Sequence, residues 1–135
     1  MGKAFWLGFA AYLLPTFPLG YVWHLKTFAP VYHRLDMYRA DVIIPLGLAS
    51  MVIQGLIFSF AYPRLFSTAP ADTWRSAGAA FIVFGLLAFS FVVLPVAAKY
   101  RMTSVLDFMA LETAFTLLQF AVVAPLMALA HRQAL

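Results

Sequence analysis

The sequence predicts an all-α protein, a four-transmembrane-helix bundle with a short amphipathic interfacial segment between helices 1 and 2. The first observation is composition: 64% of the residues are hydrophobic and 10% are charged, whereas soluble domains average roughly 45–50% apolar and 25% charged. The second is a set of four apolar runs, each of about the 20 residues that a helix needs to cross a bilayer. Little sequence remains for a soluble domain, so we expect residues 1–135 to form a single integral membrane domain. Its helices are expected at about residues 4–23, 41–62, 76–98 and 104–130.

Local signals indicate where these helices begin and end. Asp41 stands where an N-terminal cap of the second helix is expected, and the Tyr-Pro pair at residues 62–63 is expected to end that helix. Ser104 and Asp107 have the spacing of a capping box at the start of the fourth helix. The link at residues 99–102 is very short, so the third and fourth helices are expected to be antiparallel neighbours.

The first connection, residues 24–40, is too polar to span a membrane, yet its apolar residues recur every three to four positions. This rhythm is typical of an amphipathic helix that lies in the membrane interface, here interrupted at Pro30. We expect its apolar side chains to rest on the interface or to cap the bundle. They are Leu25, Phe28, Val31, Tyr32, Leu35 and Tyr38.

The formal net charge is +4, but the basic residues stand at helix ends, where they contact lipid headgroups. This placement favours the lipid bilayer as the partner and no nucleic acid. Four spans put both termini on one side, and the basic residues divide almost evenly between the two sides, so the positive-inside rule does not determine the orientation. We take cytoplasmic termini as the expectation. The two groups are Lys3, Arg64, Arg75 and Arg132 against Lys26, Arg34, Arg39, Lys99 and Arg101.

Glu112 is the one charged residue inside the four apolar runs. A carboxylate is costly to keep in hydrocarbon, so intramembrane acids face protein or water and are candidate functional residues. We expect Glu112 to point into the bundle and to form a hydrogen bond with helix 1, helix 2 or the connection between them. The candidate partners are Ser50, Gln54, Tyr21 and an arginine.

Further polar residues follow helical spacing on the second and fourth helices. Glu112, Thr116 and Gln119 share one face of the fourth helix, and Ser50 and Gln54 share a face of the second. Two polar faces in a four-helix protein are expected to meet. Two interpretations remain open: hydrogen bonds between helices that fix their packing, or a carboxylate that binds a proton or a ligand.

The residues of catalytic and metal sites are sparse. There is no cysteine, and no activated serine, phosphate-binding loop or paired-histidine zinc motif is recognised, so we expect no enzyme and no cofactor. His24 and His33 share the first connection, while His131 falls on the opposite side of the membrane. We therefore do not expect one metal ion bound by all three, and we interpret the histidines as interfacial residues. A haem held by one or two of them is an alternative that only their presence supports.

The segment from Pro18 to Tyr32 resembles a family of small bacterial four-helix membrane proteins of unknown function. In that family a glycine late in helix 1 precedes a tryptophan and an aromatic, proline-containing turn, here Gly20 and Trp23 followed by Phe28-Ala29-Pro30. The resemblance implies a bacterial inner-membrane protein with four spans, and it implies no activity. The candidate residues of this interfacial motif are Gly20, Trp23, His24, Tyr32 and Arg39.

Together these observations predict an integral membrane binding or accessory protein with a polar intramembrane site around Glu112. A homo-oligomer or a place in a larger membrane complex is expected. The alternative is a small proton-linked transporter or carrier that uses Glu112. The candidate residues of the polar core are Glu112, Thr116, Gln119, Gln54 and Ser50.

Overall fold

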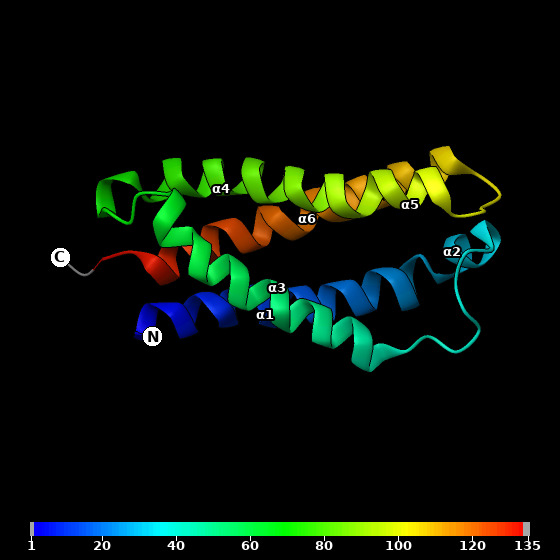
Figure 1. Ribbon diagram of the computed structural model, residues 1–135, viewed down its shortest axis with the longest axis horizontal. Coiled ribbons are helices and arrows are strands. Elements are labelled where there is room, and N and C mark those ends of the chain that lie inside the picture. The colour runs from blue at the N-terminus through cyan, green and yellow to red at the C-terminus, as the bar shows by residue number, and fades with distance from the viewer. Residues whose placement is uncertain (1, 134–135) are drawn as a thin grey trace.

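The computed structural model describes residues 2–133 and is helical throughout, with no strand in that range (Figure 1). Two π-helical turns, Trp23–Thr27 and Phe89–Val93, extend α1 and join α4 to α5. A 3-10 turn, Pro70–Asp72, leads into α4. The α-helices are α1 (Lys3–Val22), α2 (Ala29–Leu35), α3 (Ile44–Leu65), α4 (Thr73–Ala88), α5 (Leu94–Lys99) and α6 (Val105–His131).

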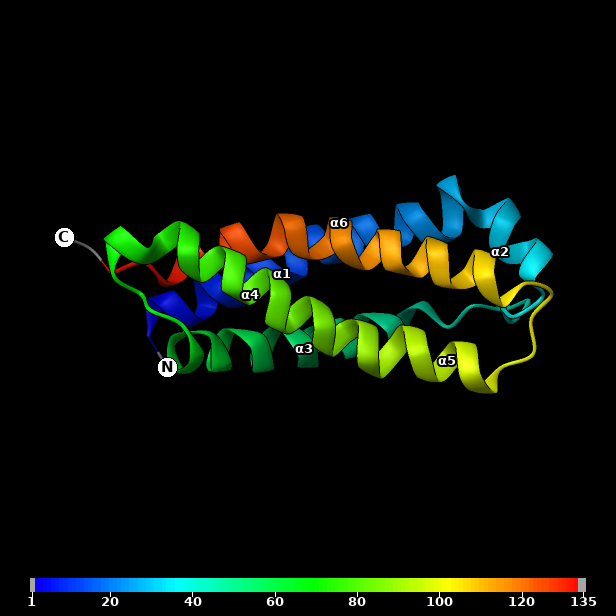
Figure 2. The ribbon, with the colours of Figure 1, turned by 90° about the horizontal axis from the view of Figure 1, so that it is seen from above.

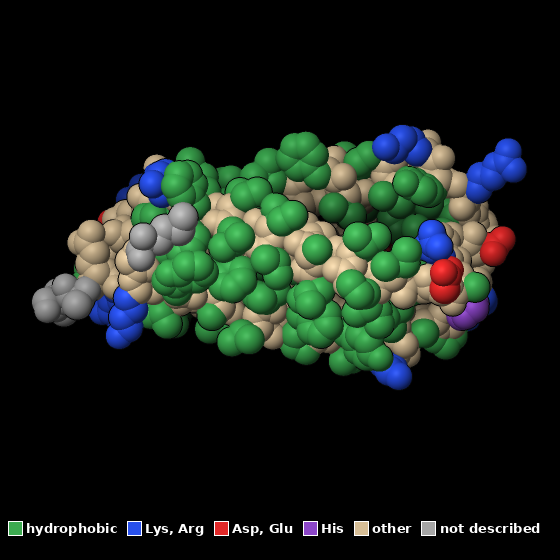
Figure 3. Space-filling view, turned by 60° about the horizontal axis from the view of Figure 1, so that its bottom comes forward, with side chains coloured by type: hydrophobic (Ala, Val, Ile, Leu, Met, Phe, Trp, Pro, Cys, Tyr) green, Lys and Arg blue, Asp and Glu red, His purple; other side chains and the backbone are tan. Residues whose placement is uncertain are grey.

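Four helical segments of the described chain are long and apolar enough to cross a membrane, which confirms the predicted bundle. α1 begins and α6 ends at the same end of the molecule, opposite α2 (Figure 1). In Figure 3 the middle of the surface is mostly hydrophobic, and lysine and arginine gather at the two ends. These segments are Lys3–Thr27, Ile44–Leu65, Pro70–Lys99 and Val105–His131.

α6 is the central helix, because it packs against both α1 and α4, while α3 packs mainly along α1. Backbone contact of α3 with α4 or α5 is sparse, and α3 meets α4 through Phe58, which stacks on Phe84 with ring centroids 4.5 Å apart. In Figure 1 the first half of α3 diverges from α5 toward the α2 end of the bundle, and Figure 2 shows α1 and α6 in one layer with α3 and α5 in the other. The bundle is therefore closed around α6 and loosely packed between α3 and α5.

The connection after α1 forms a cap over one end of the bundle, as its apolar rhythm predicted. Tyr32 and Leu35 of α2 are buried, whereas His33 on the opposite face is exposed. Thr103, in the link before α6, donates its backbone N–H to Leu35 O at 3.1 Å and its hydroxyl to Arg34 O at 2.7 Å. These bonds fix α2 to the start of α6.

Two predicted boundaries of the second helix are wrong. α3 begins at Ile44 and not at Asp41, because Pro45 has no N–H and is tolerated only in the first turn of a helix. Asp41 is exposed and pairs with Arg39 at 3.2 Å. α3 also continues past residues 62–63 to Leu65, since Phe66 N–H still bonds Tyr62 O at 3.0 Å and Pro63 falls in the last turn.

The other boundaries lie closer to the prediction. The third span begins earlier than residue 76, at Pro70, and passes through the π-helical turn just before Pro95, whose ring and missing N–H disturb a regular helix. The cap of α6 is confirmed, because Ser104 Oγ accepts a hydrogen bond from Asp107 N–H at 3.2 Å.

Candidate functional site

Glu112 points into the bundle, as predicted from the cost of placing it in lipid, and is only 7% exposed. Its side-chain oxygen Oε1 accepts a hydrogen bond from the hydroxyl of Tyr32 and lies 3.1 Å from Nε2 of His24. The partners come from α2 and from the π-helical turn after α1, which agrees with the predicted region. None of the partners named from the sequence, Ser50, Gln54, Tyr21 or an arginine, takes this place.

Local structure explains why His24 reaches Glu112. α1 passes into the π-helical turn Trp23–Thr27, and His24 Nδ1 bonds the carbonyl oxygen of Gly20 at 2.8 Å. Phe115 of α6 packs edge-on against the imidazole, with ring centroids 4.6 Å apart. The ring is thus fixed by a backbone acceptor on one side and by an aromatic side chain on the other.

The contacts of His24 also determine the number of protons that the pair holds. A carbonyl oxygen can only accept, so Nδ1 donates to Gly20 O and carries a proton. The 3.1 Å contact between Nε2 and Glu112 Oε1 needs a second proton, because two lone pairs would repel each other. This tautomer is assigned from the hydrogen-bond partners. The second proton belongs to an imidazolium or to a carboxylic acid, and in both cases the pair has no net charge.

Two tyrosines close the site on the side of α2. Tyr32 is 1% exposed and stacks on Tyr38, with ring centroids 4.8 Å apart and planes 8° from parallel. Burial raises the pKa of Tyr32 far above its usual range, and the Glu112 carboxylate adds to this effect. Partial burial and then Glu112 likewise raise the pKa of Tyr38, although 39% of this residue is exposed. Both phenols therefore keep their protons at physiological pH, and Tyr32 remains a donor to Glu112.

The two predicted polar faces meet through a residue of α1 that the sequence analysis did not select. The hydroxyl of Tyr12 donates to Gln54 Oε1 at 2.6 Å and accepts from Gln119 Nε2 at 3.2 Å. Gln119 also reaches Thr16 Oγ1 at 3.4 Å, and Gln54 donates to Ser50 Oγ at 3.3 Å. A hydrogen-bonded chain of side chains thus joins α6, α1 and α3.

These polar groups line one wall of a cavity of about 500 Å³ enclosed by all four spans. Glu112 and His24 lie at one end, and the rest of the wall is mainly apolar. Ser50 of α3 and Phe91 of the π-helical turn before α5 are exposed where these elements diverge, with Phe91 76% exposed. The cavity therefore opens sideways, between α3 and the α4–α5 segment, at the depth of the apolar surface.

One oxygen of Glu112 is left for this cavity. Both hydrogen bonds that the described residues make to the carboxyl group end on Oε1. Oε2 has no hydrogen-bond partner among the described residues, and it is not fully buried. Glu112 lines the cavity. Oε2 is consequently free to bind a molecule that enters.

The remaining predicted residues have different positions. Thr116 lines the cavity, but its hydroxyl bonds the Glu112 carbonyl one turn earlier at 2.8 Å. Gly20 is buried, and Trp23 packs on Phe28 with centroids 4.4 Å apart, consistent with packing roles. Arg39 is exposed and paired with Asp41, so it takes no part in the site.

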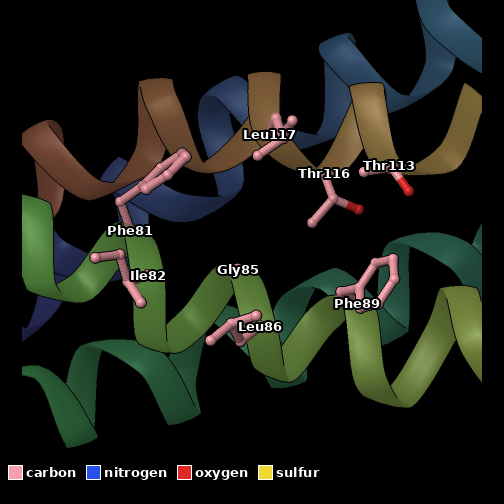
Figure 4. Close-up of a pocket in the computed structure, with 8 residues that line it drawn as sticks. All are labelled: Phe81, Ile82, Gly85, Leu86, Phe89, Thr113, Thr116 and Leu117. Carbon is pink, nitrogen blue, oxygen red and sulfur yellow. The ribbon is translucent and has the colours of Figure 1, made fainter. Parts of the chain in front are cut away.

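A second hollow, of about 340 Å³, lies between α4 and α6. Figure 4 shows its wall: Phe81, Ile82, Gly85, Leu86 and Phe89 on one side and Thr113, Thr116 and Leu117 on the other. Threonine hydroxyls are its only polar side-chain groups, so it lacks the donors and acceptors that orient a ligand. It serves as an apolar comparison for the cavity at Glu112.

His131 belongs to a second polar cluster at the opposite end of the bundle, which the sequence analysis did not find. Ser59 Oγ donates to the backbone oxygen of Phe5 at 2.6 Å, and His131 Nε2 lies 3.1 Å from Ser59 Oγ. Tyr62 stacks on the imidazole with centroids 5.2 Å apart. One signal in the sequence points to the buried face of α1. Small or polar residues recur every four positions on that face, at Gly8, Tyr12, Thr16 and Gly20.

We expect Gly8→Ala to destabilise the protein, because its new Cβ would clash with His131 Nε2 and Ser59 Oγ. Overpacking of this kind costs about 1–3 kcal/mol. The control is Gly78→Ala on α4, where a Cβ has open space and alanine favours the helix. Unfolding in mixed detergent and sodium dodecyl sulfate measures both variants. Equal free energies of unfolding for Gly8→Ala and Gly78→Ala would contradict the close approach of α1 to His131.

Among the described residues no group of three or more histidine or acidic side chains is placed to hold a metal ion. Comparisons with protein-family models, with curated proteins and with solved structures give no match for this chain. The likeness of residues 18–32 to small bacterial membrane proteins therefore stays a prediction. Any function must be argued from the geometry of the site itself.

Proposed function

We propose that this protein is an integral membrane binding protein that holds a small amphiphilic molecule in the cavity at Glu112. The observation that carries the proposal is the combination of a sideways opening in the apolar surface with a free carboxyl oxygen at the inner end. Ligand sites are typically pockets of about 300–1,000 Å³ with mostly apolar walls and a few polar groups that orient the ligand. The cavity has this composition and size.

The distribution of polar and apolar groups along the cavity wall also predicts how the bound molecule is oriented. Met51, Phe58 and Phe91 offer apolar contact along the cavity, whereas Glu112 lies with His24 at one end. An amphiphile from the bilayer would enter between α3 and α5 and place its polar group at Glu112. Its apolar part would remain between the helices or extend into lipid.

We expect Ser50→Phe to block this cavity, since Ser50 lies in its wall on the exposed side of α3. The matched control is Gly85→Phe, which fills the hollow between α4 and α6; a Cβ there meets only Phe120, at 4.0 Å. Each protein is purified from membranes in mild detergent, and bound small molecules are extracted and quantified by mass spectrometry. The wild type and Gly85→Phe should carry one amphiphile in near-stoichiometric amount, and Ser50→Phe should carry at least tenfold less. Equal amounts in wild type and Ser50→Phe, or none in wild type, would refute the proposal.

A proton-linked carrier is the second candidate, and the proton between His24 and Glu112 favours it. A carrier must also move its ligand across the membrane. Uptake of the identified amphiphile into proteoliposomes with an imposed pH gradient distinguishes the two. If the amphiphile binds but is not taken up in response to the pH gradient, the protein is a binding protein. If uptake follows the gradient, the protein is a carrier.

The resemblance of residues 18–32 supports the bacterial inner membrane as the location. We keep the cytoplasmic side for the start of α1 and the end of α6 as a separate expectation. The opening between α3 and α5 also supports association with a second copy or another membrane protein, because a ligand held there could pass directly to a neighbour. Cross-linking in intact membranes tests this association.

A further inference from the structure

We propose that the cavity binds a lipophilic ammonium cation at Glu112 in exchange for the proton that Glu112 shares with His24. This inference rests on the proposed function and names its ligand class. It has three parts: the sign of the charge at the site, the number of protons released and the shape of the ligand.

The charges that face the cavity favour a cation. Among the described residues, 2–133, Glu112 is the only acidic residue in its wall, and no lysine or arginine lines it. The basic residues near this end of the bundle are exposed, Lys26, Arg34 and Arg39 among them. His24 has no N–H left for an anion, because Nδ1 bonds Gly20 O and Nε2 faces Glu112. Glu112 Oε2 is therefore the free ionisable atom, and an acceptor of this kind selects a donor that carries positive charge.

Aromatic rings near the carboxyl group add to this preference. Phe115 lines the cavity and packs against both His24 and Trp23, with centroid distances of 4.6 and 5.8 Å. The faces of aromatic rings attract cations, most strongly where water is excluded. A phosphate or carboxylate headgroup would find no lysine or arginine among the described residues of the same wall.

Charge balance sets the number of protons exchanged. Before binding, the His24–Glu112 pair holds one shared proton and has no net charge. Adding an ammonium ion while the proton stays would leave one uncompensated positive charge in a poorly solvated site, which is costly. When the proton leaves to water, Glu112 is a carboxylate, His24 is neutral and the ammonium ion balances the charge. Because Nε2 of His24 and Oε1 of Glu112 repel each other without the shared proton, these two atoms separate, and ammonium N–H groups donate to both. One cation enters and one proton leaves.

No other titratable group that faces Glu112 competes for this role. Tyr32 of α2 and Tyr38 of the connection keep their protons at physiological pH because of burial and the carboxylate. From α1 and α3 the facing groups are the uncharged Tyr12, Thr16 and Gln54, and the π-helical turn before α5 contributes apolar side chains. The exchange therefore involves a single proton.

The shape of the cavity sets the rest of the ligand. About 500 Å³ of mainly apolar space accommodates a hydrocarbon body behind the ammonium group. The apolar residues of this space include Met51, Ile57, Phe58, Leu87, Phe91 and Phe120.

Equilibrium binding of radiolabelled dodecylammonium, dodecanol and dodecanoate to the full chain in phosphatidylcholine nanodiscs tests the inference, with empty nanodiscs as the blank. Dodecylammonium should bind at least tenfold more tightly than dodecanol, and dodecanoate least. Its apparent affinity should rise by about tenfold per pH unit while the site is protonated, as one released proton requires. The amine itself stays charged below about pH 9, since alkyl ammonium groups resemble lysine.

Glu112→Gln keeps an oxygen acceptor and removes the charge. It should weaken dodecylammonium binding at least tenfold and abolish its pH dependence, so that dodecylammonium no longer binds more tightly than dodecanol to this variant. The pH dependence of the wild type is an independent readout that needs no variant to fold. Equal affinity for ammonium and alcohol, or an affinity that does not change with pH, would overturn the inference but leave the proposed function standing. Failure of all three probes to bind the cavity would refute both.

Discussion

Replacing Glu112 with alanine should lower the free energy of unfolding by about 3 kcal/mol, the largest effect we expect from a single substitution. The change removes the acceptor of Tyr32, which is 1% exposed, and the partner of His24. Breaking a buried pair by removing one member costs about 3–5 kcal/mol in soluble proteins. Interhelical hydrogen bonds in a membrane average only about 0.6 kcal/mol, and the cavity admits solvent or lipid to the freed groups. The lower end of the range is therefore expected.

Titration from mild detergent into sodium dodecyl sulfate, followed by circular dichroism, measures this free energy. Asp107→Ala is the matched control: it removes a carboxylate from the same helix at an exposed position in its first turn. Its effect should stay below about 1 kcal/mol, as for a charge at a helix end. A Glu112→Ala variant as stable as Asp107→Ala would mean that the contacts with Tyr32 and His24 do not hold the bundle together.

Replacing Tyr12 with phenylalanine should lower the free energy of unfolding by about 1–3 kcal/mol. The hydroxyl joins Gln54 and Gln119, and its removal leaves the buried Gln119 amide with only its longer bond to Thr16 and takes the donor from Oε1 of the half-buried Gln54. An unsatisfied buried polar group costs about 1–3 kcal/mol. The ring itself remains, so packing is unchanged.

Tyr62 offers the matched control for this variant. It is as buried as Tyr12, at 1% exposure, and its hydroxyl has no hydrogen-bond partner in the part of the chain that the structure describes. Tyr62→Phe should therefore be neutral or slightly stabilising in the same titration. If Tyr12→Phe and Tyr62→Phe shift the unfolding transition equally, the chain from Gln119 through Tyr12 to Gln54 contributes nothing to stability.

Prediction from the sequence succeeded where one physical cost dominates. Apolar runs of spanning length predicted four helices, and the cost of a carboxylate in lipid predicted that Glu112 turns inward. The capping pair of α6 followed from local hydrogen bonding alone. Asp41 was misassigned as a cap because the constraint from Pro45, which has no N–H to donate, was overlooked.

The partners of Glu112 depend on tertiary contacts that no local pattern shows. His24 reaches it through a π-helical turn, and Tyr32 does so because Thr103 fixes α2 against the start of α6. Tyr12 was passed over because a tyrosine in an apolar run is equally at home facing lipid or the core. The two polar faces were expected to touch directly, and they are joined instead by this tyrosine of α1.

The most direct test of the site uses a feature of the composition: Glu112 is the only glutamate in the sequence. Protein labelled with 13C at the glutamate carboxyl carbon therefore reports on this one group. Solid-state NMR in lipid bilayers can measure the dipolar coupling between this carbon and the nitrogen of 15N-labelled dodecylammonium. We predict a carbon-to-nitrogen distance of about 3–4 Å, because charge-assisted N–H···O bonds are about 2.7–2.9 Å long, and a carboxyl chemical shift that changes on binding. A coupling that stays undetectable at saturating ligand, with the carboxyl shift unchanged, would contradict a ligand site at Glu112.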